Sequence, residues 1–314
     1  MTLQAHLFHA KQAACALALA AALLAPLAAN AADAGASAPS GTDPTQLAFA
    51  EAERAARPGP ADIELADQAV LHLPAGRSFV PQPQAGKLLN AMGNPGSDPR
   101  LQGLIFPKGD GGWFMTVRYE SSGYVKDDDA KDWKADELLK NYQEGTEASN
   151  EQRLKMGVKP IEVLGWAEKP AYDATTHRLA WAMSSREKGA AADAPQGVNY
   201  NTYALGREGY FSLNLVTDLK DLQAHRPAAQ ALLGALDYKA GKRYADFDAK
   251  TDHVAEYGLA ALVVGVAAKK LGLIALALGF FAKFAKVILI GLALVGGGAA
   301  KLFKRKKPDA STNA

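Results

Sequence analysis

Cysteine is almost absent from this sequence: its 314 residues contain one, Cys15. Cys15 lies in an apolar stretch near the amino terminus, Ala13 to Ala25, which has the length of the hydrophobic region of a secretory signal peptide. If that segment is removed on export, the mature chain contains no cysteine. It then has no disulfide, no thiolate metal site and no cysteine nucleophile, and packing must stabilise it.

The amino-terminal segment carries the other marks of a signal peptide. Lys11 supplies positive charge before the apolar stretch, and Ala29-Asn30-Ala31 forms the small-x-small pattern of a cleavage site. We therefore predict a signal peptide at residues 1–31. The alternative is a buried helix that opens a cytosolic domain, but the Ala/Ser/Pro/Gly-rich spacer that follows would pack poorly in a core. Residues 32–60 are assigned to a flexible linker and a short N-terminal segment.

Common catalytic sequence motifs are also absent. The chain has no G-x-S-x-G nucleophile elbow, no Walker phosphate loop and no H-E-x-x-H zinc motif. The histidines that follow the predicted signal peptide are too scattered for the paired spacing of a zinc helix. They are His72, His177, His225 and His253. We expect no cofactor, and an enzyme is less favoured than a non-enzymatic function.

Charge is unevenly distributed along the chain. Nine Lys or Arg residues and one acid follow Tyr257, whereas the stretch from Ala32 to Glu256 holds 25 basic and 32 acidic residues. A nucleic-acid-binding protein needs a basic face to displace counterions from phosphates. The acidic body therefore argues against nucleic acid as a partner.

The carboxyl-terminal region, assigned to residues 254–303, is predicted to be membrane-associated and helical. From Gly258 to Phe303 nearly every residue is apolar or Gly, apart from five lysines. One helix through this stretch would be roughly 70 Å long, more than twice the hydrocarbon thickness of about 30 Å. The segment that would cross a bilayer at the lowest free-energy cost is 284–303, because Lys286 and Lys301 lie close enough to its ends to reach the headgroups.

The basic cluster KRKK, 304–307, belongs on the cytoplasmic side of a membrane. With a cleaved signal peptide, this requires an odd number of crossings, so we predict one span and a cytoplasmic tail at 304–314. A two-span hairpin is the rival. A buried helix pair in a soluble protein is the other alternative, but the glycines at 296–298 would weaken such helices in water. The lipid bilayer is thus an expected partner.

The body between these ends, residues 61–253, is predicted to be a single α+β domain with a mainly antiparallel sheet flanked by helices. Seven short runs have the composition or alternation of strands, and three segments have helical patterns. The predicted strands are 69–73, 101–106, 113–119, 161–166, 178–183, 198–204 and 210–216. The predicted helices are 84–92, 135–156 and 218–236, and residues 246–256 are interpreted as a linker to the membrane.

Three consecutive aspartates, Asp127, Asp128 and Asp129, follow the β-rich run at 113–119. Acidic residues before a helix accept hydrogen bonds from its unpaired N–H groups, and their negative charge interacts favourably with the positive end of the helix dipole. Helix capping is therefore the preferred interpretation. A plain solvated surface would serve equally well. A metal or acid/base site and a contact with a partner are the alternatives, although consecutive aspartates do not face one point in a regular strand or helix.

Two further polar residues are binding candidates. Asn199 lies in a polar strand, and Arg207 lies in the Gly-flanked turn 206–209. The functional interpretation is an anion clamp formed by Arg207 beside Asn199. The simpler interpretation is a tight turn with Arg207 paired to an acid. The aromatic positions Trp166 and Trp181 are interpreted as packing rather than as a ligand stack.

The ordered set of motifs resembles a known family. These motifs are GGWF (111–114), GYVKDDDA (123–130), GW (165–166), PAYD (170–173), LAWA (179–182), VNYN (198–201), LGREG (205–209), GKRYADF (241–247) and TDHVAEYGLAALVVG (251–265). Over about 61–303 the chain is similar to the bacterial membrane-anchored family called domain of unknown function 2167. The resemblance implies an exported body tethered by a hydrophobic carboxyl region, and it supplies no catalytic residues.

Together these observations predict an envelope protein of the inner (cytoplasmic) membrane. Its body would lie in the periplasm and bind or assemble envelope proteins, with no reaction assignable. Two alternatives stay open. One is a metal-assisted hydrolase that uses the cluster Asp127 to Asp129 with a distant His or Glu. The other is a small-ligand sensor with an apolar pocket near Trp166, Trp181 and Tyr200.

Overall fold

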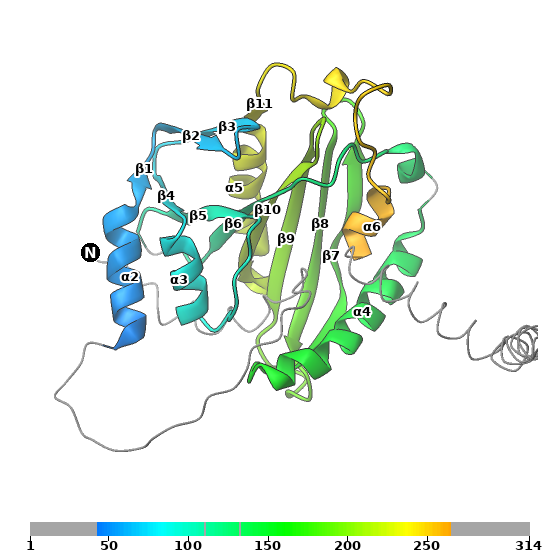
Figure 1. Ribbon diagram of the computed structural model, residues 1–314. Coiled ribbons are helices and arrows are strands. Elements are labelled where there is room, and N and C mark those ends of the chain that lie inside the picture. The colour runs from blue at the N-terminus through cyan, green and yellow to red at the C-terminus, as the bar shows by residue number, and fades with distance from the viewer. Residues whose placement is uncertain (1–42, 110, 132, 265–314) are drawn as a thin grey trace, which may run out of the picture. The chain divides into compact units, whose positions relative to one another are not determined.

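The structure is a computed structural model that describes residues 43–109, 111–131 and 133–264. Figure 1 shows the arrangement of its helices and strands. The helices are α2 (Pro44–Ala55), α3 (Gln84–Ala91), α4 (Ala135–Lys155), α5 (Leu222–Gly234) and α6 (Leu259–Val264), with short 3-10 turns η3 (Asp128–Lys131), η4 (Leu219–Asp221) and η5 (Tyr244–Asp246). The strands are β1 (Arg57–Pro58), β2 (Ala61–Leu65), β3 (Ala69–Leu73), β4 (Arg77–Pro81), β5 (Leu101–Pro107), β6 (Phe114–Glu120), β7 (Ile161–Asp173), β8 (Arg178–Glu187), β9 (Gly197–Leu205), β10 (Tyr210–Asp218) and β11 (Leu236–Tyr238).

The main sheet joins two antiparallel meanders. Its strand order is β1-β4-β5-β6-β10-β9-β8-β7, and every neighbouring pair is antiparallel. After β6 the chain passes through α4 to the far edge and then returns strand by strand until β10 pairs with β6. The β6–β10 pairing, with Tyr210 opposite Glu120 and Val216 opposite Phe114, therefore holds the two halves together.

One face of this sheet is covered by α5 and a second, three-stranded sheet of order β11-β3-β2. Alternate residues of β10 point into this layer because side chains alternate across a strand. Phe211, Leu213 and Leu215 are fully buried there, with Leu232 from α5 and Leu71 from β3. This apolar layer is the larger core of the domain.

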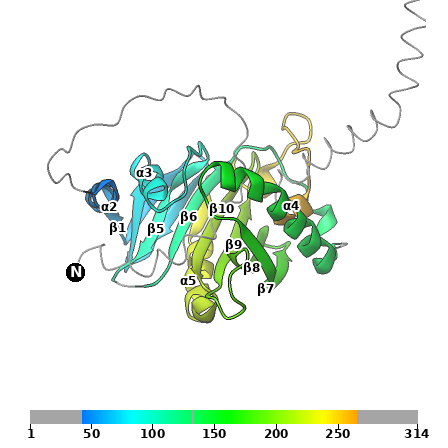
Figure 2. The same cartoon turned by 90° about the horizontal axis from the view of Figure 1, so that it is seen from below.

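The opposite face carries two separate groups of helices. Helices α2 and α3 pack over β4 and β5, and their apolar cluster includes Phe49, Leu88 and Val216. Helices α4 and α6 pack at the other end, where α4 lies along β7 and the cluster includes Trp181 and Leu262. Figure 2 shows α5 on the side of the sheet away from α2, α3 and α4.

The predicted fold class is confirmed for the body: it is α+β, mainly antiparallel, and flanked by helices. All seven predicted strands lie on observed strands, and the three predicted helices correspond to α3, α4 and to η4 with α5. Two features were not foreseen. Helix α2 lies within the segment interpreted as linker, where Asp43 caps the helix by accepting a hydrogen bond from the Thr45 amide at 3.0 Å. Four strands were also missed: β2 and β11 of the small sheet and β1 and β4 of the main sheet.

The predicted carboxyl-terminal span, 284–303, lies outside the described residues, as does the predicted signal peptide. Among residues 43–109, 111–131 and 133–264, no helix has the length and apolar character needed to cross a bilayer. The segment 246–256, interpreted as a linker, packs against the body, as does α6. The linker interpretation is therefore wrong for these residues.

Candidate functional site

The candidate site lies at the end of the sheet where the β9–β10 turn meets residues 239–257, which we call the strap. The strap leaves β11 and leads to α6, crossing the ends of the strands (Figure 1). Two isolated bridges fasten it: Gly206 pairs with Arg243, and Tyr124 pairs with Val254. The Tyr124 amide donates to the His253 carbonyl at 2.8 Å, and the Ala255 amide donates to the Tyr124 carbonyl at 2.9 Å.

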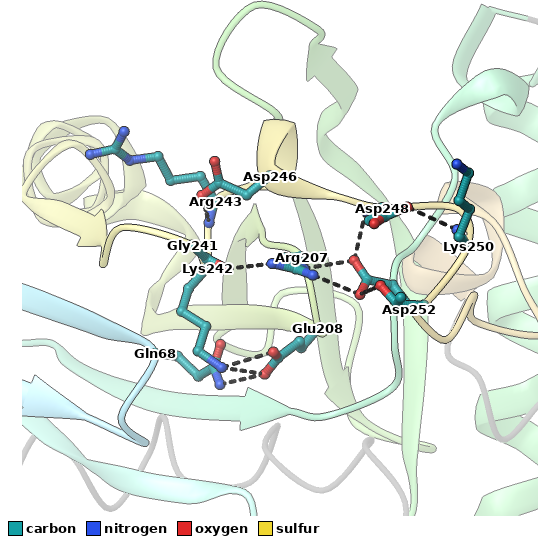
Figure 3. A network of polar contacts seen from close by, with 11 residues as sticks. Gln68, Arg207, Glu208, Gly241, Lys242, Arg243, Asp246, Asp248, Lys250 and Asp252 are labelled. Carbon is teal, nitrogen blue, oxygen red and sulfur yellow. Dashed lines mark hydrogen bonds and ion pairs between the residues drawn. The ribbon is translucent and has the colours of Figure 1, made fainter.

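Arg207 forms the central ion pair of this site. Its Nε donates to Asp252 Oδ2 at 2.6 Å and its Nη2 donates to Asp252 Oδ1 at 2.8 Å, a bidentate arrangement (Figure 3). Nη1 donates to the Gly241 carbonyl at 3.2 Å. The Asp252 side chain is only 11% exposed. The hydrogen bonds from Arg207 hold the pKa of Asp252 well below its usual value.

A second ion pair lies beside the first. Lys242 Nζ contacts both carboxylate oxygens of Glu208 at 2.8 Å, and Gln68 Nε2 donates to Glu208 Oε2 at 2.8 Å (Figure 3). Hydrogen bonding from Lys242 lowers the pKa of Glu208. Both carboxyl groups therefore stabilise the folded chain above their unfolded pKa values, and this contribution is lost as the pH falls through their folded values.

A pocket of about 310 Å³ opens next to these pairs. It is lined mostly by charged and uncharged polar residues: Ser121, Gly123, Arg207, Glu208, Thr251, Asp252 and His253. The charged members are already bonded to one another or to Lys242. The simplest consequence is structural: the network fastens the strap to the β9–β10 turn.

The three predicted aspartates have three different surroundings. Asp129 accepts hydrogen bonds from the amides of Leu259 at 3.1 Å and Ala260 at 3.0 Å, so it caps α6. Asp128 is exposed and begins η3, and Asp127 accepts a hydrogen bond from Tyr172. The capping interpretation thus applies to Asp129, but to a helix 130 residues later in the chain and not to α4, whose N-cap residue Lys134 makes no capping hydrogen bond with its side chain.

Asp129→Ala should loosen α6 locally. The first-turn amides of this helix would lose their acceptor, which typically costs about 0.5–2 kcal/mol. Hydrogen exchange followed by mass spectrometry should show faster exchange in peptides covering residues 257–264. Asp128→Ala is the matched control and should leave exchange there unchanged. Equal effects of the two substitutions would contradict the cap.

Asp127 belongs to a polar cluster built from three segments. Tyr172 OH, near the end of β7, donates to Asp127 Oδ2 at 2.6 Å and lies 3.1 Å from His177 Nδ1, in the β7–β8 turn. His177 Nδ1 is 3.6 Å from Asp127 Oδ2. Burial, together with the hydrogen bond to Asp127, raises the pKa of Tyr172 well above its usual value.

A column of aromatic rings packs against this cluster. The ring of His177 stacks on Tyr244 at a centroid distance of 4.0 Å, Tyr244 on Tyr124 at 4.3 Å, and Tyr124 on Phe247 at 3.9 Å. Tyr244 OH also donates to the Val125 carbonyl at 2.9 Å. These contacts join the strap to the loop after β6 and to the β7–β8 turn.

Asn199 does not join Arg207. It lies six residues before Leu205 along β9, and so roughly 20 Å from that strand end at about 3.3 Å per residue. The predicted anion clamp is therefore wrong, and the simpler interpretation holds for Arg207, which pairs with an acid. The sensor pocket is not assembled either, because Trp181 and Tyr200 belong to clusters on opposite faces of the sheet.

Sequence analysis missed the partners that complete these sites: Tyr172, His177, Glu208, Lys242 and Asp252. His177 is 50 residues from Asp127, and Asp252 is 45 residues from Arg207. No spacing rule connects residues so far apart. The one available signal was the excess of polar residues in both the LGREG turn and the strap.

The fold and site define an α+β domain with an antiparallel sheet whose end is closed by an ion-paired strap. The chain belongs to the family described as "Protein of unknown function (DUF2167)", which matches residues 57–293. This confirms the resemblance predicted from the motifs. No curated protein sequence matches the chain.

One solved structure to which the chain is similar is the solution structure of cyanobacterial PsbP (CyanoP) from Synechocystis sp. PCC 6803. The sequence identity is 8%, the match covers 57% of this chain and 92% of that chain, and the TM-score is 0.36. A likeness at this level carries no argument about function.

Proposed function

We infer that this protein is a membrane-tethered envelope protein whose periplasmic body is a non-enzymatic binding or assembly domain. The tether would be the carboxyl-terminal hydrophobic stretch, and the bilayer and other envelope proteins would be the partners. The observation that carries this inference is the strap. It bonds the chain to the body immediately before the hydrophobic stretch begins at Gly258.

Three features support this proposal. Leu259, Leu262 and Val263, at the start of the hydrophobic stretch, are buried in the body, so the start of this stretch is part of the folded domain. The charged side chains at the pocket form two ion pairs, Arg207 with Asp252 and Lys242 with Glu208. Such pairs fit a structural role better than they fit an acid–base site, which needs a carboxyl group able to exchange a proton with a substrate. The three aspartates proposed for a hydrolase have different surroundings: Asp127 bonds to Tyr172, Asp129 caps α6, and Asp128 is exposed.

Reporter fusions test the topology of this proposal. An alkaline phosphatase reporter, which needs an oxidising compartment for its disulfides, should be active when fused after Val266 and inactive when fused after Ala314. A fluorescent protein that matures only in the cytoplasm should give the opposite pattern. Phosphatase activity at Ala314 would overturn the single span.

Fractionation tests the membrane tether itself. The full chain should remain in the membrane pellet after alkaline carbonate extraction, because a span of about 20 apolar residues is held by the bilayer and not by charge. A variant that ends at Val266 should leave the pellet. Recovery of the intact polypeptide, signal peptide included, in the soluble cytosol would overturn the proposal.

A further inference from the structure

A metal site is suggested by the three donor atoms that converge beside the strap. They are Asp127 Oδ2, Tyr172 OH and His177 Nδ1, and their separations are 2.6, 3.1 and 3.6 Å. Two donors bonded to one cation at about 2.1 Å and at right angles to each other are about 3.0 Å apart. The three atoms therefore form a triangle of the size of one face of an octahedral coordination sphere.

This triangle is both accessible and held in place. The side chain of Asp127 is 26% exposed and that of His177 is 27% exposed, so a solvated cation can reach them. The backbone carbonyl of His177 accepts a hydrogen bond from the Leu205 amide at 3.0 Å, and its ring stacks on Tyr244. Donors on a fixed frame lose little freedom on binding a cation, which favours a built site over a chance contact.

The chemistry of the three donor groups indicates which cation would bind. Within the described chain, no three His, Cys, Asp or Glu side chains converge for a metal, so the phenol of Tyr172 is what completes this set. A carboxylate and a phenolate are hard anionic oxygens, while imidazole binds iron readily. Tyrosine also ligates iron in some haem proteins. The combination points to ferric iron rather than to a soft or weakly acidic cation.

Binding of the cation has to displace the proton of Tyr172. In the metal-free protein the Tyr172 hydroxyl donates its hydrogen to Asp127 Oδ2 in a hydrogen bond of 2.6 Å. A strong Lewis acid is needed to displace that proton, which passes to solvent when the metal–oxygen bond forms. One carboxylate and one phenolate then offset two of the three positive charges.

We propose that Asp127, Tyr172 and His177 form a binding site for ferric iron, with water in the remaining coordination positions. The site shares no residue with the ion-paired network around Arg207 or with the proposed membrane tether. It also gives a role to Asp127, whose side chain bonds to Tyr172 and not to a helix terminus.

Visible absorption tests this proposal directly. The purified full-length chain in nonionic detergent is titrated with ferric nitrilotriacetate, and a phenolate-to-iron charge-transfer band should appear and saturate at about one equivalent. Tyr172→Phe should abolish the band. Asp127→Asn and His177→Asn should weaken binding at least about tenfold. Asparagine is chosen at position 177 because His177 has φ 52°, which asparagine tolerates.

The controls separate this site from adventitious iron. Tyr200→Phe removes a phenol on the other face of the sheet, and Asp128→Asn removes the neighbouring exposed carboxylate; both should retain the band and its affinity. Circular dichroism confirms that each variant is folded. A wild-type chain without the band, a band that survives Tyr172→Phe, or unchanged affinity in both asparagine variants would overturn the proposal.

Discussion

Replacing Trp181 by alanine should lower the free energy of unfolding by about 3–5 kcal/mol, the range for loss of a buried large aromatic side chain. Trp181 is 1% exposed and packs edge-on against Tyr203, with ring centroids 4.8 Å apart. It lies in the cluster that also contains Leu259 and Leu262 of α6. Its loss should therefore also loosen the carboxyl-terminal end of the body. Urea denaturation followed by far-ultraviolet circular dichroism measures the change.

Trp181→Phe and Leu154→Ala are the matched controls. The indole N–H of Trp181 is buried and has no hydrogen-bond partner in the part of the chain that the structure describes. Phenylalanine keeps much of the ring volume and sacrifices no hydrogen bond, so it should cost much less than alanine. Leu154 is 61% exposed, and its truncation should change stability by less than about 0.5 kcal/mol. If Trp181→Phe cost as much as Trp181→Ala, the packing argument would fail.

Gly209→Ala is the second substitution with a large expected effect. Gly209 has φ 155°, a conformation that L side chains rarely adopt, and a Cβ there would lie far inside van der Waals contact with the backbone carbonyl of Glu120. Backbone strain of this kind costs about 1–3 kcal/mol before the clash is counted. Because Tyr210 pairs with Glu120 in the β6–β10 register, relief of the clash would separate the two meanders. Urea denaturation should show a loss above about 3 kcal/mol, or the variant should fail to fold.

Gly241→Ala is the control for the positive φ alone. Gly241 has φ 79°, and a Cβ there would have no atom within 4 Å. Its cost should be limited to about 1–2 kcal/mol for the left-handed conformation. A loss at Gly209 no greater than that at Gly241 would contradict the close approach of β10 to Glu120.

Six of the eight main-sheet strands, β5 to β10, and most helices were predictable because their signals are local. The alternation in β6 and β10 and the apolar stripe of α5 are properties of neighbouring residues. The strand order was not predictable in the same way. A simple meander follows from the order of strands in the sequence, whereas the observed insertion of β10 beside β6 depends on the crossing through α4. The short β2 and β11 have too few residues to show a period.

The candidate sites were only partly predictable. The sequence drew attention to Arg207 and to the aspartates, because charged residues at turns and element ends are unusual enough to notice. It could not indicate that Arg207 pairs with Asp252, that Asp129 caps α6, or that Asp127 lies 3.6 Å from His177. Each of these contacts joins residues at least 45 positions apart.

By itself, the sequence determined the α+β class of the body, the family, and the two hydrophobic ends on which the proposed location rests. Those properties follow from composition and from periods of two or 3.6 residues, which act over a few neighbours. Only the tertiary structure decided which charges pair, which helix Asp129 caps, and which donors meet around Tyr172. The physical reason is that strand pairing in the sheet brings the strap and the turns together, so residues far apart in the sequence become neighbours without any local pattern that marks them.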